Sequence, residues 1–255
     1  MVLHGPIGPR RVQVRSASLT DIGLRHKTNE DAVEVIVPPD GQQWGFDAIA
    51  IICDGVSGQP RGDMASKLAI DAFRAGFTHP EERPIAERLE IASAAASASI
   101  IDYARRDMGG APVATTVVAL VVTGQTATIG HVGNSRAYLL RDGELDVLTA
   151  DHSFVADQVR QGLMVAADAR RHPMRSRISR ALGTPDADAM DVSECAVKSG
   201  DIFLLSSDGL HDLVAEAAIK SAIGVDLQET ARRLIDLANA EGGPDNITVA
   251  LVGIG

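Results

Sequence analysis

Residues 48–55 read Ala-Ile-Ala-Ile-Ile-Cys-Asp-Gly, an apolar run that ends abruptly in an acid and a glycine. A run this short, with several isoleucines and a closing turn residue, predicts a buried strand. The same arrangement recurs near residue 202, where Ile-Phe-Leu-Leu leads through two serines into Asp208-Gly209. The predicted fold and the predicted site both depend on such strands with acids at their ends.

Strand-like patterns recur along the whole chain and are interrupted by helical ones. About ten segments are predicted as strands: 12–19, 32–37, 48–53, 113–122, 126–132, 136–140, 145–148, 190–197, 202–206 and 247–254. Apolar residues at helical spacing predict helices from residue 62, from residue 85 and over 227–238. Asp142-Gly143 predicts a tight hairpin, so the pairing should be mostly antiparallel. Two stacked sheets with helices outside would bury these elements, which is an α+β fold.

Composition limits the possible functions. The 255 residues are 45% hydrophobic and 23% charged, which is typical of one globular domain spanning 1–255, with 1–11 as a ragged N-terminal tail. A formal net charge of −10 disfavours nucleic acid and anionic membranes as partners. Neither a membrane-length apolar run nor a signal-peptide core is visible in the sequence, so we expect a cytoplasmic protein.

Acids stand at the ends of four predicted strands. Asn29-Glu30-Asp31 precedes the strand at 32, Asp54 and Asp208 follow strands, and Asp245 precedes the last strand. Each alone is typical of an ordinary turn. If these ends meet at one rim, the carboxylates repel one another and a divalent cation relieves the repulsion. Oxygen ligands favour Mg²⁺ or Mn²⁺, and no cluster with zinc spacing is present in the sequence.

Eight short motifs, from about residue 16 to 252, occur in a recognisable order. They are Thr20-Asp21-Ile22-Gly23 with Asn29-Glu30-Asp31-Ala32; Cys53-Asp54-Gly55 with Gly62-Asp63-Met64-Ala65-Ser66; Ala114-Thr115-Thr116; Gly133-Asn134-Ser135-Arg136; Asp151-His152-Ser153; Arg180-Ala181-Leu182-Gly183; Ser207-Asp208-Gly209-Leu210; and Gly243-Pro244-Asp245-Asn246. Together they resemble the metal-dependent Ser/Thr protein phosphatases, or type 2C phosphatases, in their bacterial single-domain form.

The resemblance implies a central β-sandwich flanked by helix pairs, with two Mn²⁺ or Mg²⁺ ions at one end. It implies that Asp54 bridges the ions, that Gly55 offers its carbonyl to one, and that Asp208 and Asp245 bind the other. Glu30 and Asp31 would hold metal-bound waters. A water or hydroxide between the ions would attack phosphoserine or phosphothreonine directly, without a phospho-enzyme.

The sequence departs from the family pattern near the predicted site. Arginine is usual where His26 stands, so His26 or the neighbouring Arg25 would bind the substrate phosphate. Asn134 replaces an aspartate, so a third cation site with Asp208 and Asp212 should be weak. Asn134 is equally well explained as the cap of a turn. Residues 160–173 are predicted to form a flap near the site, with an exposed basic loop as the alternative.

Three functions remain open from the sequence. The first is a phosphoprotein phosphatase, expected to be monomeric and to oppose a Ser/Thr kinase. The second is a catalytically weak or inactive regulatory protein with the same fold. The evidence for it is the substitutions at 26 and 134, with Gln59 in Ser57-Gly58-Gln59, where Gly-Gly-His is usual in the family. The third is another two-metal hydrolase such as a nuclease, which the negative charge disfavours. The intact set of acids favours the first.

Overall fold

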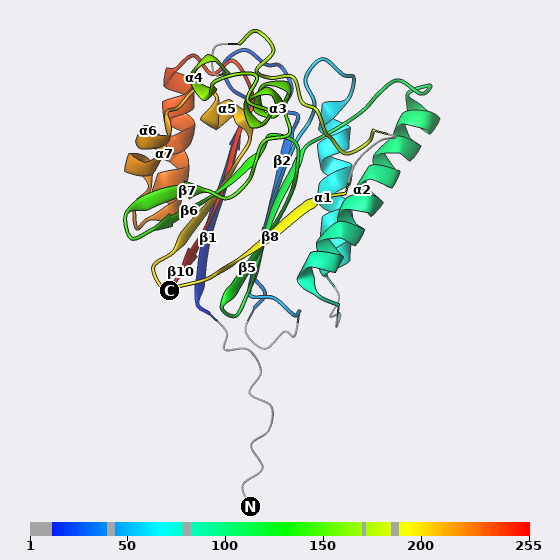
Figure 1. The fold of residues 1–255 in the computed structure, drawn as a ribbon. Helices are drawn as coiled ribbons and strands as arrows, with labels where there is room; N and C mark the ends of the chain where they lie inside the picture. The colour runs from blue at the N-terminus through cyan, green and yellow to red at the C-terminus, as the bar shows by residue number, and fades with distance from the viewer. Residues whose placement is uncertain (1–11, 40–43, 79–82, 170–171, 185–188) are drawn as a thin grey trace, which may run out of the picture.

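The computed structural model describes residues 12–39, 44–78, 83–169, 172–184 and 189–255. The predicted tail at 1–11 lies outside these residues. Two five-stranded sheets lie face to face between helices (Figure 1). One sheet has the order β1-β10-β9-β6-β7 and comprises Val14–Asp21, Ile247–Ile254, Ile202–Ser206, Arg136–Arg141 and Glu144–Val147. The other has the order β2-β3-β4-β5-β8 and comprises Asp31–Ile36, Ala48–Asp54, Val117–Thr123, Thr126–Val132 and Asp191–Ala196.

Every strand pairing in these two sheets is antiparallel. The predicted α+β sandwich is therefore confirmed. The predicted strands at 126–132, 202–206 and 247–254 have the bounds of β5, β9 and β10. The strand expected from 113 begins only at Val117. Before it, the side chains of Thr115 and Thr116 form hydrogen bonds with the backbone of Asp54.

Alternate side chains of the apolar strand β3 pack into two separate core layers. In β3, Ile49, Ile51 and Cys53 pack toward the helices on one side. Ala48, Ala50 and Ile52 pack against the opposite sheet. Successive strand side chains point to opposite faces, so a continuous apolar run is buried on both.

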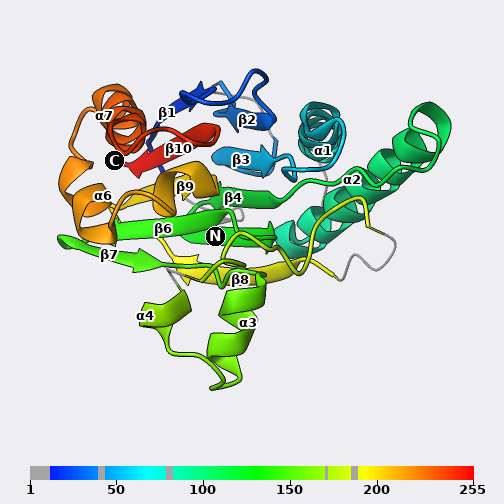
Figure 2. The ribbon, with the colours of Figure 1, turned by 90° about the horizontal axis from the view of Figure 1, so that it is seen from above.

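Helices cover the two outer faces of the sandwich, as predicted. Helices α1 (Gly62–Phe77) and α2 (Ile85–Asp107) pack on the sheet that contains β3. Helices α6 (Glu216–Ala222) and α7 (Leu227–Ala240) pack on the other sheet, and the short α5 (Asp208–His211) lies beside them. Figure 2 shows these layers end-on, with α3 (Phe154–Arg160) and α4 (Ala166–Ala169) set apart from both helix layers.

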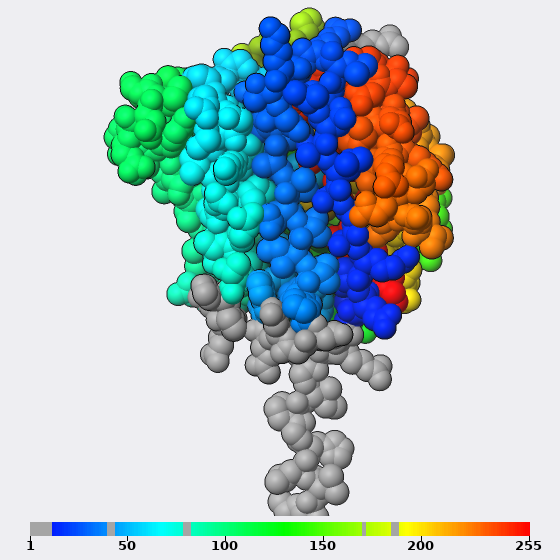
Figure 3. Space-filling model, turned by 180° about the vertical axis from the view of Figure 1, so that it is seen from behind, coloured from blue at the N-terminus to red at the C-terminus, as the bar shows by residue number. Residues whose placement is uncertain are grey.

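The rear face shows how the layers meet. Figure 3 shows β1 and β2 exposed between α1 and α7, because each strand is the edge of its own sheet. Among the helices in the described ranges, none has the length and apolar character needed to cross a membrane.

Candidate active site

Antiparallel pairing brings two of the predicted acids face to face. Asp31 begins β2 and Asp54 ends β3, and their Cα atoms are register partners. The backbone of Asp54 is fixed independently of its carboxyl group. Its carbonyl accepts from Thr115 Oγ1 at 2.8 Å and from the Thr116 amide at 2.8 Å, while its amide donates to Thr116 Oγ1 at 3.2 Å. The Asp54 side chain is therefore left available for a ligand.

Asp208 and Asp245 reach the same end of the sandwich from the other sheet. Asp208 follows β9 and Asp245 precedes β10, and these two strands are antiparallel neighbours. The backbones behind them touch, because a Cβ on Gly209 would lie 1.9 Å from the Asn246 carbonyl oxygen. The two loops thus form one packed unit in which only glycine fits at 209.

Two hydroxyl groups join the sheets at this point. Asp31 Oδ2 accepts from Ser207 Oγ at 2.8 Å and from Thr248 Oγ1 at 2.6 Å. Thr248 lies on β10 and Ser207 directly follows β9, and both strands belong to the sheet opposite Asp31. Neither hydroxyl was predicted to act at the site, although Ser207 directly precedes Asp208 and Thr248 closely follows Asp245.

The Asn246 side chain ties the remaining loops to the cluster. Its Oδ1 accepts from the Glu30 amide at 2.8 Å, and its Nδ2 donates to the carbonyls of Ile22 at 2.9 Å and Thr28 at 3.2 Å. Its position beside Asp245 was visible in the sequence, but its partners depend on tertiary packing.

The pKa values reflect carboxylates crowded without a counter-charge. Burial, with smaller contributions from Asp212 and Asp245, raises the pKa of Asp208 to about 7. Burial raises the pKa of Asp31 to about 6, and burial with the charges of Asp31 and Asp208 raises the pKa of Asp54 well above its usual range. Crowded acids of this kind are the donor set that a hard divalent cation requires, so the residues fit such an ion.

The two residues predicted to bind the substrate phosphate, His26 and Arg25, lie in different surroundings. His26 Nε2 lies 3.3 Å from Asp245 Oδ1, with a third of the side chain exposed. Arg25 is exposed beside Gly242. Glu30 lies against Gly62, and burial followed by the charge of Asp63 raises its pKa. Of the two candidates, His26 is therefore the one in contact with an acid of the cluster.

Asn134 lies beside Asp208, as the third-site prediction requires. Its Nδ2 donates to Asp208 Oδ2 at 2.9 Å, and within the described part of the chain its buried Oδ1 has no hydrogen-bond partner. Asp212 is 4.0 Å from Arg175 at the closest N–O approach. An unpartnered carbonyl oxygen and an exposed carboxylate suit a weakly held cation.

A cavity of about 560 Å³ adjoins this position. Asn134 and Asp212 line one side, and α3 and α4 with Arg175 line another. The predicted flap at 160–173 overlaps this second side, but residues 170–171 lie outside the described ones. Its role as a flap stays a prediction.

With this geometry in view, comparison with known proteins identifies the family. The chain matches the protein phosphatase 2C family over residues 25–248, and it belongs to that family. It is 33% identical over 242 residues to the serine/threonine protein phosphatase PstP of Mycobacterium tuberculosis, covering 94% of this chain. It is 31% identical over 243 residues to the protein phosphatase PhpP of Streptococcus pneumoniae, covering 92% of this chain and 95% of that protein.

A solved structure agrees with these relationships. The PstP catalytic domain in complex with two manganese ions superposes with a TM-score of 0.81 at 32% identity, covering 94% of this chain and 98% of that one. This chain spans 45% of the length of full PstP.

The raised pKa values predict how stability changes with pH. Between the usual aspartate pKa of 3.8 and about 7, Asp208 holds its proton more firmly in the folded chain than in the unfolded one. The free energy of unfolding of the metal-free protein should therefore fall as pH rises through this window. Calorimetry in EDTA should give a lower melting temperature at pH 8 than at pH 5, and Mn²⁺ should raise it more at pH 8.

The control for this prediction is Asp208→Asn. The amide does not titrate, so the loss of stability between pH 5 and pH 8 should become smaller. A larger Mn²⁺-induced shift at pH 5 than at pH 8 in the unaltered protein would contradict the prediction.

Proposed function

We propose that this protein hydrolyses phosphoserine and phosphothreonine in proteins with the help of two Mn²⁺ or Mg²⁺ ions. One observation carries the proposal: Asp31, Asp54, Asp208 and Asp245, drawn from both sheets, converge at one end of the sandwich. Membership of the phosphatase family and the names of PstP and PhpP support it.

The residues divide into those that would bind the cations directly and those that would bind them through water. Asp54 and the Gly55 carbonyl would hold one ion, Asp54 would share the second with Asp208 and Asp245, and Glu30 and Asp31 would act through bound water. Asp212 with Asn134 would hold a weak third ion. When bound, the pair of cations activates water and neutralises charge on the phosphoryl oxygens.

Ser207, which directly precedes Asp208, is poorly placed to act as a nucleophile. The Ser207 hydroxyl donates to Asp31 and accepts from the Thr248 amide at 3.0 Å, so it is committed to structure. A nucleophilic serine needs an adjacent general base that removes its proton, and a carboxylate already engaged with two hydroxyls suits that role poorly. This supports direct hydrolysis without a phospho-enzyme.

We further propose that the substrates include targets of a Ser/Thr kinase. The relatives named as protein phosphatases support phosphoprotein substrates. The opposing kinase, the monomeric state and the cytoplasmic location stay predictions from the sequence.

The test is turnover of a phosphothreonine peptide with Mn²⁺, with Mg²⁺ and with EDTA. We expect cation-dependent release of phosphate that EDTA abolishes. Binding of Mn²⁺ without turnover would favour the regulatory alternative. Turnover of nucleic acid in place of the phosphopeptide would favour a nuclease.

His26→Arg should strengthen substrate binding. A guanidinium clamps a phosphate with two charge-assisted hydrogen bonds, which are about twice as strong as the neutral bonds of an imidazole. The KM for the phosphothreonine peptide should fall by about fivefold, with a smaller change in kcat. His26→Gln is the matched control and should not lower KM, and equal KM values in the two variants would contradict the prediction.

A further inference from the structure

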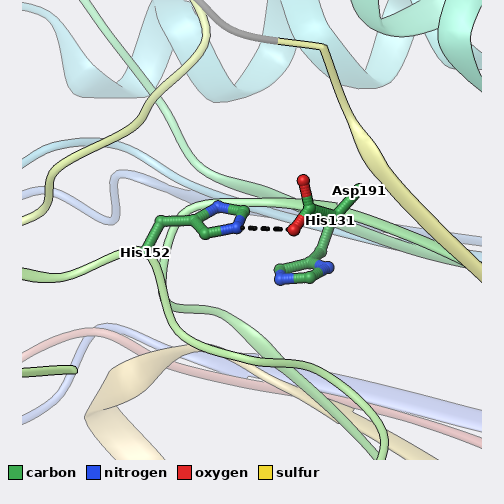
Figure 4. A group of neighbouring side chains, drawn as sticks. All are labelled: His131, His152 and Asp191. Carbon is green, nitrogen blue, oxygen red and sulfur yellow. Dashed lines mark hydrogen bonds and ion pairs between the residues drawn. The ribbon is translucent and has the colours of Figure 1, made fainter. Parts of the chain in front are cut away.

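Two histidines and an aspartate form a compact group next to the acid cluster. His131 lies on β5, Asp191 begins β8, and His152 lies just before α3 (Figure 4). One potential ligand atom from each lies within 4.8 Å of the others, and the imidazole rings stack with centroids 4.6 Å apart. Both histidines are buried. Such a group has the composition of a transition-metal site.

The hydrogen bonds of His152 argue against a metal there. Its Nδ1 lies 3.0 Å from the Gly133 amide, which can only donate. A neutral imidazole has one donor and one acceptor nitrogen, so we place the proton on Nε2, opposite the nitrogen that the Gly133 amide requires as an acceptor. That proton points to Asp191 Oδ2 at 3.1 Å, the contact drawn in Figure 4. Arg180 Nη1 lies 2.7 Å from the same Nε2, and the Asp191 carboxylate faces both groups. A metal at Nε2 would need the lone pair that this tautomer lacks.

The negative charge of Asp191, which would attract a cation, is already paired with Arg180. Arg180 Nη1 donates to Asp191 Oδ1 at 2.8 Å. Hydrogen bonds from Arg180 and His152 lower the pKa of Asp191 despite the opposing effect of its partial burial. Burial lowers the pKa of His152, which keeps the ring neutral. The group therefore forms a hydrogen-bonded chain from Asp191 through His152 to the Gly133 amide.

The end of this chain is one residue from the acid cluster. Asn134 follows Gly133 and donates from Nδ2 to Asp208 Oδ2. From the other side, His211 Nε2 lies 3.1 Å from the Asn134 carbonyl, with Nδ1 2.9 Å from Ser206 Oγ. The Gly133–Asn134 backbone is thus held by one imidazole that accepts and one that donates.

The local backbone shows why fixation through the peptide group matters. Gly133 has a φ of +112°, and a Cβ there would lie 2.6 Å from Thr116. No side chain is available at 133 to anchor the loop. Gly133 is therefore held through its backbone: its amide donates to His152 Nδ1, and its carbonyl accepts from the His152 amide at 2.9 Å.

We propose that Asp191 and His152 act as positioning residues for the acid cluster. Asp191 fixes His152 as an acceptor, His152 holds the Gly133 amide, and this places the Asn134 amide group against Asp208, which sets the affinity of the cluster for divalent cations. The inference rests on the proposed function in one respect, namely that the cluster binds Mn²⁺.

Asp191→Ala tests the chain from its exposed end. Half of the Asp191 side chain is exposed, so the fold should tolerate the change. Arg180 Nη1, 2.7 Å from His152 Nε2, would then donate to that nitrogen and shift the proton to Nδ1, opposite the Gly133 amide. Loss of an outer-shell partner typically costs about tenfold or more in metal affinity, and we expect Mn²⁺ binding by calorimetry to weaken by about threefold to tenfold.

The matched control is Glu194→Ala. Glu194 is an exposed acid on the same strand, β8, and contacts Thr128 at 3.3 Å rather than His152. Its replacement removes the same charge but leaves the chain intact. Its Mn²⁺ affinity should stay within about a factor of two of that of the unaltered protein, because solvent screens exposed charges.

Two substitutions of His152 separate its two nitrogens. Asn places an acceptor near the position of Nδ1, whereas Gln reaches the position of Nε2. His152→Asn should keep Mn²⁺ affinity closer to that of the unaltered protein than His152→Gln does. Nitrogen-15 NMR of the imidazole should show a proton on Nε2 in the unaltered protein and on Nδ1 in Asp191→Ala.

A double variant tests the route through Asn134. In an Asn134→Ala background, Asp191→Ala should weaken Mn²⁺ binding little further, since both act on the same contact. An additive loss would overturn the proposal, as would lower stability in Asp191→Ala with unchanged affinity. Zn²⁺ bound by the two histidines would overturn it in favour of a second metal site. Failure of the unaltered protein to bind Mn²⁺ would reject the proposed function itself.

Discussion

Asp54→Asn should abolish phosphatase turnover and, at the same time, stabilise the metal-free protein. The loss of activity should be about a thousandfold or more, because on the proposed function the Asp54 carboxylate would hold both cations. The gain in stability follows from the raised pKa of Asp54, since at neutral pH a buried amide avoids both the cost of burying a carboxylate and repulsion by Asp31 and Asp208. Phosphopeptide turnover and melting in EDTA measure the two effects.

The matched control is Asp201→Asn. Asp201 is also a buried aspartate, but Arg141 donates to it at 2.8 and 2.6 Å, and it directly precedes β9. Loss of that pair should lower the melting temperature and leave turnover intact. If Asp54→Asn, like Asp201→Asn, melts at a lower temperature than the unaltered protein, then the crowded carboxylates do not destabilise the metal-free protein.

Gly209→Ala should damage both stability and activity. The added Cβ would lie 1.9 Å from the Asn246 carbonyl oxygen, a backbone atom, so one of the two backbones must shift. The loops that carry Asp208 and Asp245 would be forced apart. We expect the free energy of unfolding to fall by about 3 kcal/mol. Turnover should fall by about a hundredfold, because a displacement near 1 Å in a catalytic group has effects of that size. Denaturant unfolding and phosphopeptide kinetics measure these changes.

The control for added volume is Gly76→Ala. Gly76 is in α1, and the nearest atom to an added Cβ there is the Ala92 Cβ at 3.4 Å, an ordinary contact. This variant should gain about 0.5 kcal/mol of stability from the higher helix propensity of alanine. Unchanged stability in Gly209→Ala would show that the two loops can separate without cost.

Strands bounded by turn residues were predicted well because their signal is local. β5, β9 and β10 are apolar runs that end at glycine, serine or asparagine, so their limits are visible in the sequence. The short helices α5 and α6 were missed, because a four-residue helix beginning at Asp208 carries no apolar period.

The contacts that fix the site were predictable only in part. The acids stand out because each lies at one end of an apolar run, and antiparallel pairing then brings those strand ends together. The bonds from Ser207 and Thr248 to Asp31 cross between sheets, and nothing in a linear pattern specifies how two sheets stack. The partners of His152 were missed for the same reason, since 39 positions separate it from Asp191.

The convergence of both sheets on one set of acids bears on the lifetime of the protein as well as on its chemistry. Two of the bonds that join the sheets at this end of the sandwich are hydroxyl bonds to a carboxylate whose charged form is disfavoured by burial. On the proposed function, bound cations would fasten the two layers together there, and a chain without them would open more readily to proteases. The supply of manganese would then set how long each molecule survives, so scarcity would reduce the amount of enzyme as well as its rate.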